Sequence, residues 1–361
     1  MTAPPPSLEA WPAEPEVAPP AGFGDGRGPG PGRRRRGRRA GTTTTTAKTA
    51  ISFREYSQYR ELFYNLTLRE LRSKYKRSVI GWGWSMINPL ANMAIYTIVF
   101  SILLKIQPIL GIPSGMKSYA IMYLSAMLPW TVWQSSIMES MGALLGNQNL
   151  IQKTYFPREL IPGSTVASKL VSHLIEMGLL LVVVVAAYGN FRALELLPLT
   201  IVTIALVTVF ATGMALIFSL GNVFYRDVNH FSNILFFIWM FLTPVVYPFY
   251  VIGGGIDATK ILHNPRFLHL LGHTVSLGTL FKANPMTDAV LAFQSFIYNG
   301  ALPSSAHKLT YTNTTGQVVH GTVVSSVSWG DYGYFVVWAI AIFMLGLWLF
   351  RRYEARLPEE L

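Results

Sequence analysis

The clearest pattern along the chain is a basic, amphipathic stretch that leads directly into a long uncharged one. In residues 52–80, apolar side chains recur three and four positions apart, which predicts a helix with one apolar face. Lysine and arginine crowd the polar side of its second half, as is typical of a helix in the headgroup plane of an anionic membrane leaflet. These basic residues are Arg69, Arg72, Lys74, Lys76 and Arg77.

Two helix-start signals occur in this stretch. Ser52 with Glu55, and Thr67 with Glu70, both have the S/T-x-x-E spacing of a capping box. After Thr67, the apolar residues also lie on a different side of the helix from those before it. We therefore expect the helix to break or bend near Thr67.

Beyond the basic stretch, the charges stop. No ionised residue occurs in residues 79–104, which as a helix would extend roughly 39 Å, enough to span a membrane with tilt or with a kink at Pro89. Further apolar runs bring the number of predicted transmembrane helices to six. The predicted spans cover residues 84–104, 119–145, 163–188, 194–220, 231–252 and 332–350.

Six spans place both ends of the chain on one side of the membrane. Basic residues precede the first predicted span, and Arg351, Arg352 and Arg356 follow the last one. By the positive-inside rule, we expect a multi-pass protein of the plasma membrane with both termini in the cytoplasm, residues 353–361 included.

Composition agrees with a multi-span membrane protein. Of the 361 residues, 51% are hydrophobic and only 13% are charged, so no soluble enzyme domain of ordinary size is left over. The absence of cysteine excludes disulfides, thiolate catalysis and cysteine metal sites. Residues 1–51 are rich in Pro, Gly and Arg and predict a disordered, solvated cytoplasmic tail; binding of nucleic acid is the weaker interpretation of its arginine run.

Few ionisable residues lie deep in the predicted spans. Glu139 and Lys169 lie at matching distances from the inner ends of the second and third spans, so they can meet at one depth. Lys169, His173 and Glu176 share a helical face. Three interpretations stay open for these four residues: a structural network between helices, contact with a hydrophilic substrate, or a proton relay.

Aromatic residues are numerous in and near the spans. Trp and Tyr favour the headgroup depth of a membrane, so many of these residues fit interfacial belts or the core. Others could line a path for a sugar polymer, because flat ring faces stack on the C–H face of a pyranose. The candidates for such a path are Trp82, Trp84, Tyr96, Tyr123, Trp130, Trp133, Tyr225, Trp239 and Tyr247.

The segment before the last predicted span has a different character. Residues 267–281 and 284–298 read as short apolar helices, the second with Asn284 as its cap and Pro285 as its first residue. Short apolar helices at this place predict re-entrant elements buried against the bundle. Residues 308–329 alternate and turn at Gly316, which predicts an exposed hairpin.

Residues 146–162 form a short loop between the second and third predicted spans. Apolar residues at helical spacing precede Pro157. They can dip into the lipid interface or dock into a separate cytoplasmic subunit, and both interpretations stay open.

Four sequence motifs, taken in order, carry a resemblance to a known family. They are LRELRSKYKRSVIGWGWSMINPL at 68–90, YFPRELIP at 155–162, NVFYRDVNHF at 222–231 leading into FLTPVVYP, and NPMTDAV at 284–290. Together they resemble the permease subunit of type-2 ABC exporters, within the polysaccharide, O-antigen and teichoic-acid branch. The Arg/Pro/Gly-rich tail further suggests a cell-wall galactan as the polymer.

This resemblance implies an all-α permease that works as a homodimer with two separate ATPase subunits in a lipid membrane. The substrate it implies is a polysaccharide linked to polyprenyl diphosphate. It assigns residues 52–80 to an amphipathic gate helix, the short helices before the last span to a re-entrant gate, and the loop at 146–162 to a coupling helix that contacts the ATPase. The coupling residues are Gln152, Lys153, Tyr155, Phe156, Arg158 and Glu159.

Missing motifs support a transport subunit that is not itself an enzyme. No G-x-x-x-x-G-K-[ST] occurs, so ATP and Mg are expected on the partner, with no cofactor and no metal in this chain. Two rival functions remain. A membrane-embedded glycosyltransferase would have only Arg226 and Asp227 as an acid–base pair near a span, and an ion-coupled flippase would use the Glu139 group.

Overall fold

The computed structural model describes residues 59–76, 78–103, 119–188, 194–247, 249, 267–270, 273–301, 308–312, 318–322 and 328–361. Contacts divide the chain into residues 1–48 and 49–361, and every described residue belongs to the second unit. The predicted disordered tail, the capping box at Ser52 and Glu55, Arg77 and the turn at Gly316 lie outside the described residues.

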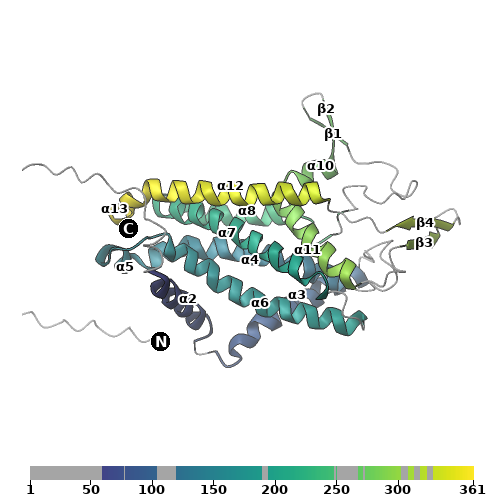
Figure 1. Cartoon of the computed structure of the whole chain (residues 1–361), viewed down its shortest axis with the longest axis horizontal. Coiled ribbons are helices and arrows are strands. Elements are labelled where there is room, and N and C mark those ends of the chain that lie inside the picture. The colour runs from purple at the N-terminus through teal and green to yellow at the C-terminus, as the bar shows by residue number, and fades with distance from the viewer. Residues whose placement is uncertain are drawn as a thin grey trace, which may run out of the picture. The chain divides into compact units, whose positions relative to one another are not determined.

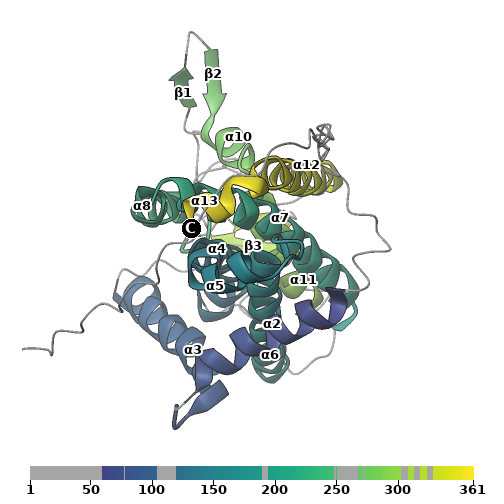
Figure 2. The ribbon, with the colours of Figure 1, turned by 90° about the vertical axis from the view of Figure 1, so that its left-hand side faces the viewer.

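The unit is a bundle of helices (Figure 1). α4 lies at its centre and contacts α3, α6, α7, α8 and α11, as the view along the bundle shows (Figure 2). Because α4 is buried on nearly every side, it is apolar around most of its circumference. The helices of the bundle are α2 (Arg60–Tyr75), α3 (Trp84–Tyr96), α4 (Tyr119–Gly146), α5 (Gln148–Lys153), α6 (Leu160–Tyr188), α7 (Leu197–Phe224), α8 (Asp227–Leu242), α10 (Leu277–Lys282), α11 (Pro285–Ala301), α12 (Trp329–Tyr353) and α13 (Leu357–Glu360).

Three helical runs among the described residues are long and apolar enough to cross a membrane. They are Leu160–Ala186, Leu197–Phe224 and Trp329–Glu360. α3 contains Pro89 and continues as a π-helix, Thr97–Leu103. The helix of the fifth predicted span, 231–252, is α8, which begins before that span and ends at Leu242. Thr243 is extended before Pro244, a conformation that proline favours in the residue that precedes it. Residues 248 and 250–252 of this span lie outside the described part of the chain.

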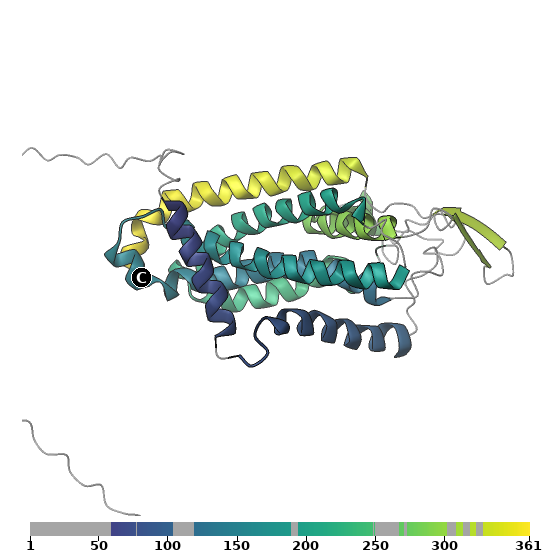
Figure 3. The same ribbon diagram turned by 60° about the horizontal axis from the view of Figure 1, so that its bottom comes forward.

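α2 runs across the bundle helices (Figure 3). The predicted break near Thr67 is wrong, since α2 is continuous from Arg60 to Tyr75. The Thr67 hydroxyl donates to the carbonyl oxygen of Phe63, four residues earlier, at 2.9 Å. This bond inside the helix takes the place of the cap that the Thr67 and Glu70 spacing predicted.

Two antiparallel hairpins accompany the helices. β3 (Lys308–Thr312) pairs with β4 (Val318–Thr322), with Lys308 opposite Thr322, which confirms the predicted hairpin. β1 (Phe267–Leu270) pairs with β2 (His273–Ser276). The predicted helix at 267–281 is therefore wrong except for its end, which forms α10. A short apolar run around a glycine suits either conformation, and here the strand pairing decides it.

α11 begins as its sequence predicts. Asn284 Oδ1 accepts a hydrogen bond from the Met286 amide at 3.1 Å, which caps the helix in front of Pro285. The same oxygen accepts from Trp239 Nε1 at 3.0 Å, and Asn284 Nδ2 donates to Thr243 Oγ1 at 2.9 Å. One side chain thus joins the start of α11 to the end of α8. α11 packs against α4, α7 and α12.

α12 begins with a capping box and packs closely against α7. Ser328 and Asp331 form a reciprocal capping box, and Lys282 Nζ lies 2.6 Å from Asp331 Oδ2. Further along, α12 crosses α7 where Gly346 faces Gly213, and a Cβ at Gly213 would lie only 2.6 Å from backbone atoms of Ile342 and Phe343. The two glycines therefore allow the two backbones to touch.

Candidate functional site

The loop that follows α5 presents one aromatic side chain and buries the next. Tyr155 is 89% exposed, whereas Phe156 is 5% exposed and belongs to an apolar cluster with Leu66, Leu144 and Ile151. Phe156 is therefore covered by its own chain. Phe156 is one of the expected coupling residues, and its contact with a partner stays a prediction; of the two adjacent rings, that of Tyr155 is the exposed one.

The other expected coupling residues divide in the same way. Gln152 and Lys153 are exposed beside Tyr155. Arg158 and Glu159 point back into the protein and bind the end of α12. The loop thus has an outer face of four consecutive exposed residues, 152–155, and an inner face that fixes its position.

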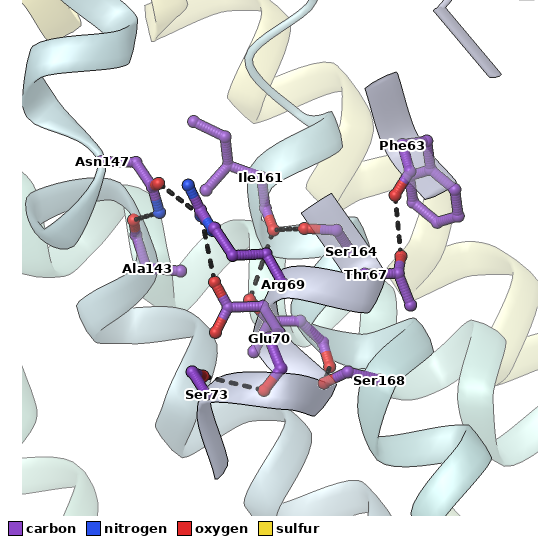
Figure 4. Close-up of polar contacts among 11 residues, drawn as sticks. Phe63, Thr67, Arg69, Glu70, Ser73, Ala143, Asn147, Ile161, Ser164 and Ser168 are labelled. Atoms are coloured by element: carbon purple, nitrogen blue, oxygen red, sulfur yellow. Dashed lines mark hydrogen bonds and ion pairs between the residues drawn. The ribbon is translucent and has the colours of Figure 1, made fainter. Parts of the chain in front are cut away.

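α2 is tied to the start of α5 by a hydrogen bond between side chains (Figure 4). Arg69 Nη2 donates to Asn147 Oδ1 at 2.6 Å and to Glu70 Oε1 at 3.1 Å. Asn147 Nδ2 in turn donates to the Ala143 carbonyl oxygen in α4 at 2.7 Å. Of the other predicted gate residues that are described, Arg72, Lys74 and Lys76 are exposed.

The segment after α12 holds the loop from another side. Arg158 Nη1 donates to the Glu354 carbonyl oxygen, and Arg351 Nε donates to Glu159 Oε1 at 3.4 Å. Glu354 follows the last residue of α12, beyond its apolar part. Burial, together with the neighbouring Glu159 carboxylate, raises the pKa of Glu354 to about 7. Leu357 is completely buried in the same cluster as Phe156.

The predicted contact between the second and third spans is present. Lys169 Nζ bonds to Glu139 Oε1; Lys169 is 7% exposed, and the Glu139 side chain is half-exposed. His173 Nδ1 lies 3.8 Å from Glu176 Oε2, and no hydrogen bond to either His173 nitrogen is found among the described residues. The geometry pairs α4 with α6, while the role of the group stays a prediction.

The candidate path aromatics differ in how far they are exposed. Trp133 is fully buried, with ring centroids 4.9 Å from Trp239 and 5.8 Å from Phe210, and Tyr123 stacks on Tyr96 at 4.5 Å. These rings are core contacts between helices. The buried rings are Tyr123, Trp130 and Trp133; the partly buried ones are Tyr96, Trp239 and Tyr247; Trp84 and Tyr225 are exposed, and the side chain of Trp82 is not described. Their role as a sugar path stays a prediction.

The sequence model of a family described as ABC-2 type transporter matches residues 61–256, more than half of the chain. The chain belongs to the ABC-2 type transporter family. The matched residues begin in α2 and include α5, the loop with Tyr155 and the Glu139–Lys169 pair. α11, α12 and α13 lie outside them.

Several curated proteins are similar to this ABC-2 family member. The O-antigen export system permease protein RfbA of Myxococcus xanthus is 25% identical over 252 residues, 70% of this chain and 86% of that protein. RfbA of Klebsiella pneumoniae is 30% identical over 243 residues, 67% of this chain and 82% of that protein. The polysialic acid transport protein KpsM of Escherichia coli is 23% identical over 190 residues, 52% of this chain and 70% of that protein.

Three residues of this ABC-2 site were not singled out in the sequence. Asn147 stands directly before a short helix, where a polar side chain often caps, and that signal could have identified it. Glu354 and Leu357 follow a span and carry no local signal, because their partners in the loop are about two hundred residues away in the chain.

Proposed function

We propose that this protein is the channel-forming permease subunit of an ATP-driven exporter for polysaccharide carried on polyprenyl diphosphate. Family membership supports the ABC-2 permease, and the relatives named for O-antigen export support a polysaccharide as cargo. The proposal includes a homodimer in the plasma membrane, with two ATPase subunits that bind ATP and Mg on the cytoplasmic side.

The proposed topology has six spans, formed by α3 with its π-helical end, α4, α6, α7, α8 and α12. α8 alone is short, about 24 Å for its 16 residues, against a hydrocarbon core of about 30 Å. The non-helical residues Thr243, Val245 and Val246 that follow it are buried, and irregular backbone is tolerated at membrane depth only where protein covers it. The completed fifth span thus ends in this buried turn.

α11 suits the re-entrant element of that topology. Its residues from Met286 to Phe293 are buried, and its first turn is capped by Asn284. A short helix with a capped start and a mostly apolar buried surface can enter the bundle with its first backbone groups paired. We therefore assign α11 to the outer end, opposite the α5 loop.

The proposed contact with the ATPase rests on the exposure of Tyr155. An aromatic ring that is 89% exposed, beside Lys153 and on a loop with a buried inner face, has the properties of an interface hot spot. Because the buried inner face holds the loop in place, binding of a partner requires little further ordering of the loop. The ATPase is the partner that a family member without an ATP site requires.

The test replaces Tyr155 by alanine in the co-expressed complex. A hot-spot aromatic contributes about 2 kcal/mol or more, so the affinity for the ATPase should fall by about thirtyfold, with export falling in parallel. Tyr64→Ala removes another exposed tyrosine, 61% exposed on α2, and should leave ATPase binding unchanged. Normal ATPase affinity and normal export in Tyr155→Ala would refute the docking assignment.

Phe156→Ala serves as the contrasting variant. Its ring is buried among the chain's own residues, so its loss should destabilise the permease by about 3–5 kcal/mol and reduce the amount of folded protein. If the Phe156→Ala permease keeps wild-type stability but specifically loses ATPase binding, then Phe156 is the anchor of the contact.

A further inference from the structure

The residues that follow α12 lie against the α5 loop. α13 contacts both α5 and α7, and α5 and α13 lie at the same end of the bundle (Figures 1 and 2). Along the chain, the loop connects only to α4 through α5 and to α6. Arg69 of α2 also bonds to Asn147 at the start of α5. Any contact with the end of α12 adds a further helix to those that the loop can move.

We propose that the segment Glu354–Leu361 is a seat for the α5 loop, which makes α12 a helix driven by the ATPase in addition to α4 and α6. The inference rests on the proposed function, because it needs a partner that pushes on the loop. It adds a force path that leads from the loop through the seat to α12 and on to α7.

The apolar half of the seat is formed by Leu357. Its side chain is completely buried and belongs to one cluster with Ile151 of α5 and Phe156 of the loop, and Leu361 packs on the same cluster. Close-packed apolar contacts resist compression, so a displacement of the loop is passed to the seat.

Two polar bonds join the loop to the first residue of the seat and to the last turn of α12. Arg158 donates to the Glu354 backbone carbonyl, and Arg351 donates to Glu159 at 3.4 Å. Both are hydrogen bonds of charged groups, which are stronger than neutral ones. Because the two bonds join different residues of the loop, Arg158 and Glu159, to the end of α12, both must break before the loop and α12 can separate.

From α12 the path continues into α7. Gly346 and Gly213 bring the two backbones into direct contact, with no side chain between them that could absorb a small movement. A shift of α12 therefore displaces α7 as well. α7 also packs against the central α4.

The test follows two helices separately during ATP binding. The chain has no cysteine, so a single introduced cysteine carries an environment-sensitive fluorophore without a competing site. One label goes on α12 at Leu345→Cys and one on α6 at Leu174→Cys, whose native side chains are 44% and 49% exposed. The signal of each label is recorded in the full permease–ATPase complex with a non-hydrolysable ATP analogue.

We expect both labels to respond in the otherwise unchanged permease. Arg351→Gln and Leu357→Ala should reduce the α12 response about tenfold and leave the α6 response intact, because α6 is joined to the loop by the chain itself. Arg352→Gln is the matched control: this neighbouring arginine lies over Trp348, with 5.4 Å from its Cζ to the ring centroid, and should leave both responses unchanged. Leu357→Met should restore the response lost in Leu357→Ala.

Each other outcome overturns the inference. An α12 response that persists in Leu357→Ala and Arg351→Gln shows that the seat transmits nothing. An α6 response without an α12 response in the unchanged permease shows that α12 is not driven, while the ATPase contact stands. Failure of the ATPase to bind the unchanged permease refutes the proposed function and the inference together.

Discussion

Replacing Gly346 by alanine should force α12 away from α7. The added Cβ would lie 3.0 Å from Gly213 Cα and closer still to the Gly213 carbonyl oxygen. Ordinary carbon contacts are about 3.5–4.0 Å long, so the helices must separate by roughly 1 Å. The obstructing atoms are backbone atoms, which have no rotamer to change.

The magnitude follows from two opposing terms. Overpacking of this kind destabilises by about 1–3 kcal/mol, while alanine gains about 1 kcal/mol over glycine in helix propensity. Gly333→Ala isolates the second term, since it lies on the same helix and an added Cβ there meets nothing within 4 Å. Gly346→Ala should therefore be less stable than Gly333→Ala by about 1–3 kcal/mol.

Thermal unfolding of the detergent-purified variants, followed by tryptophan fluorescence at one heating rate, measures this difference. The midpoint of Gly346→Ala should lie several degrees below that of Gly333→Ala, at about 2–4 °C per kcal/mol. Gly346→Val should lower it further. If Gly346→Ala unfolds at the same temperature as Gly333→Ala, or above it, the two backbones do not touch and the path from α12 to α7 is lost with them.

Three further predictions concern single contacts. Glu139→Gln should destabilise by about 1–3 kcal/mol, less than a fully buried pair because Glu139 is half-exposed, and adding Lys169→Met should recover much of the loss; additive losses in unfolding midpoints would exclude the pairing. Asn284→Ala should lower stability by about 1–2 kcal/mol, with Asn284→Asp keeping the capping oxygen and losing less; equal midpoints for both variants would contradict the cap. Because burial raises the pKa of Glu354 from 4.5 to about 7, the stability that this group contributes is complete below pH 4.5 and is lost as the pH rises to 7. Hydrogen exchange of residues 354–361, corrected for intrinsic rates, should therefore accelerate between about pH 5 and pH 7 and level off above it, and Glu354→Gln should abolish that change.

The sequence predicts well those parts of the fold that depend on neighbouring residues or on the number of residues along a helix. Asn284 and Pro285 mark the start of α11 because cap and first-turn preferences act within one helical turn. Glu139 and Lys169 could be paired before the structure was known, since a rise of about 1.5 Å per residue fixes depth along a span.

Which way a side chain faces depends on tertiary contacts that the local sequence does not contain. Tyr155 and Phe156 are adjacent aromatics with similar local preferences, and only the cluster around Leu144 and Ile151 decides which one is buried. Thr67 illustrates a different limit. A threonine hydroxyl can cap a new helix or bond back to the preceding turn, and the spacing to Glu70 is the same in both cases.

The capping box at the start of α12 has a practical consequence for imaging. Ser328 and Asp331 define the first turn of α12 within the helix itself, and Lys282 secures Asp331 from α10. The sequence between Ala301 and Ser328 is thus not needed to specify where this helix begins. A small rigid domain inserted there should leave the bundle intact and give electron microscopy an asymmetric marker on a protein that otherwise offers mainly membrane helices.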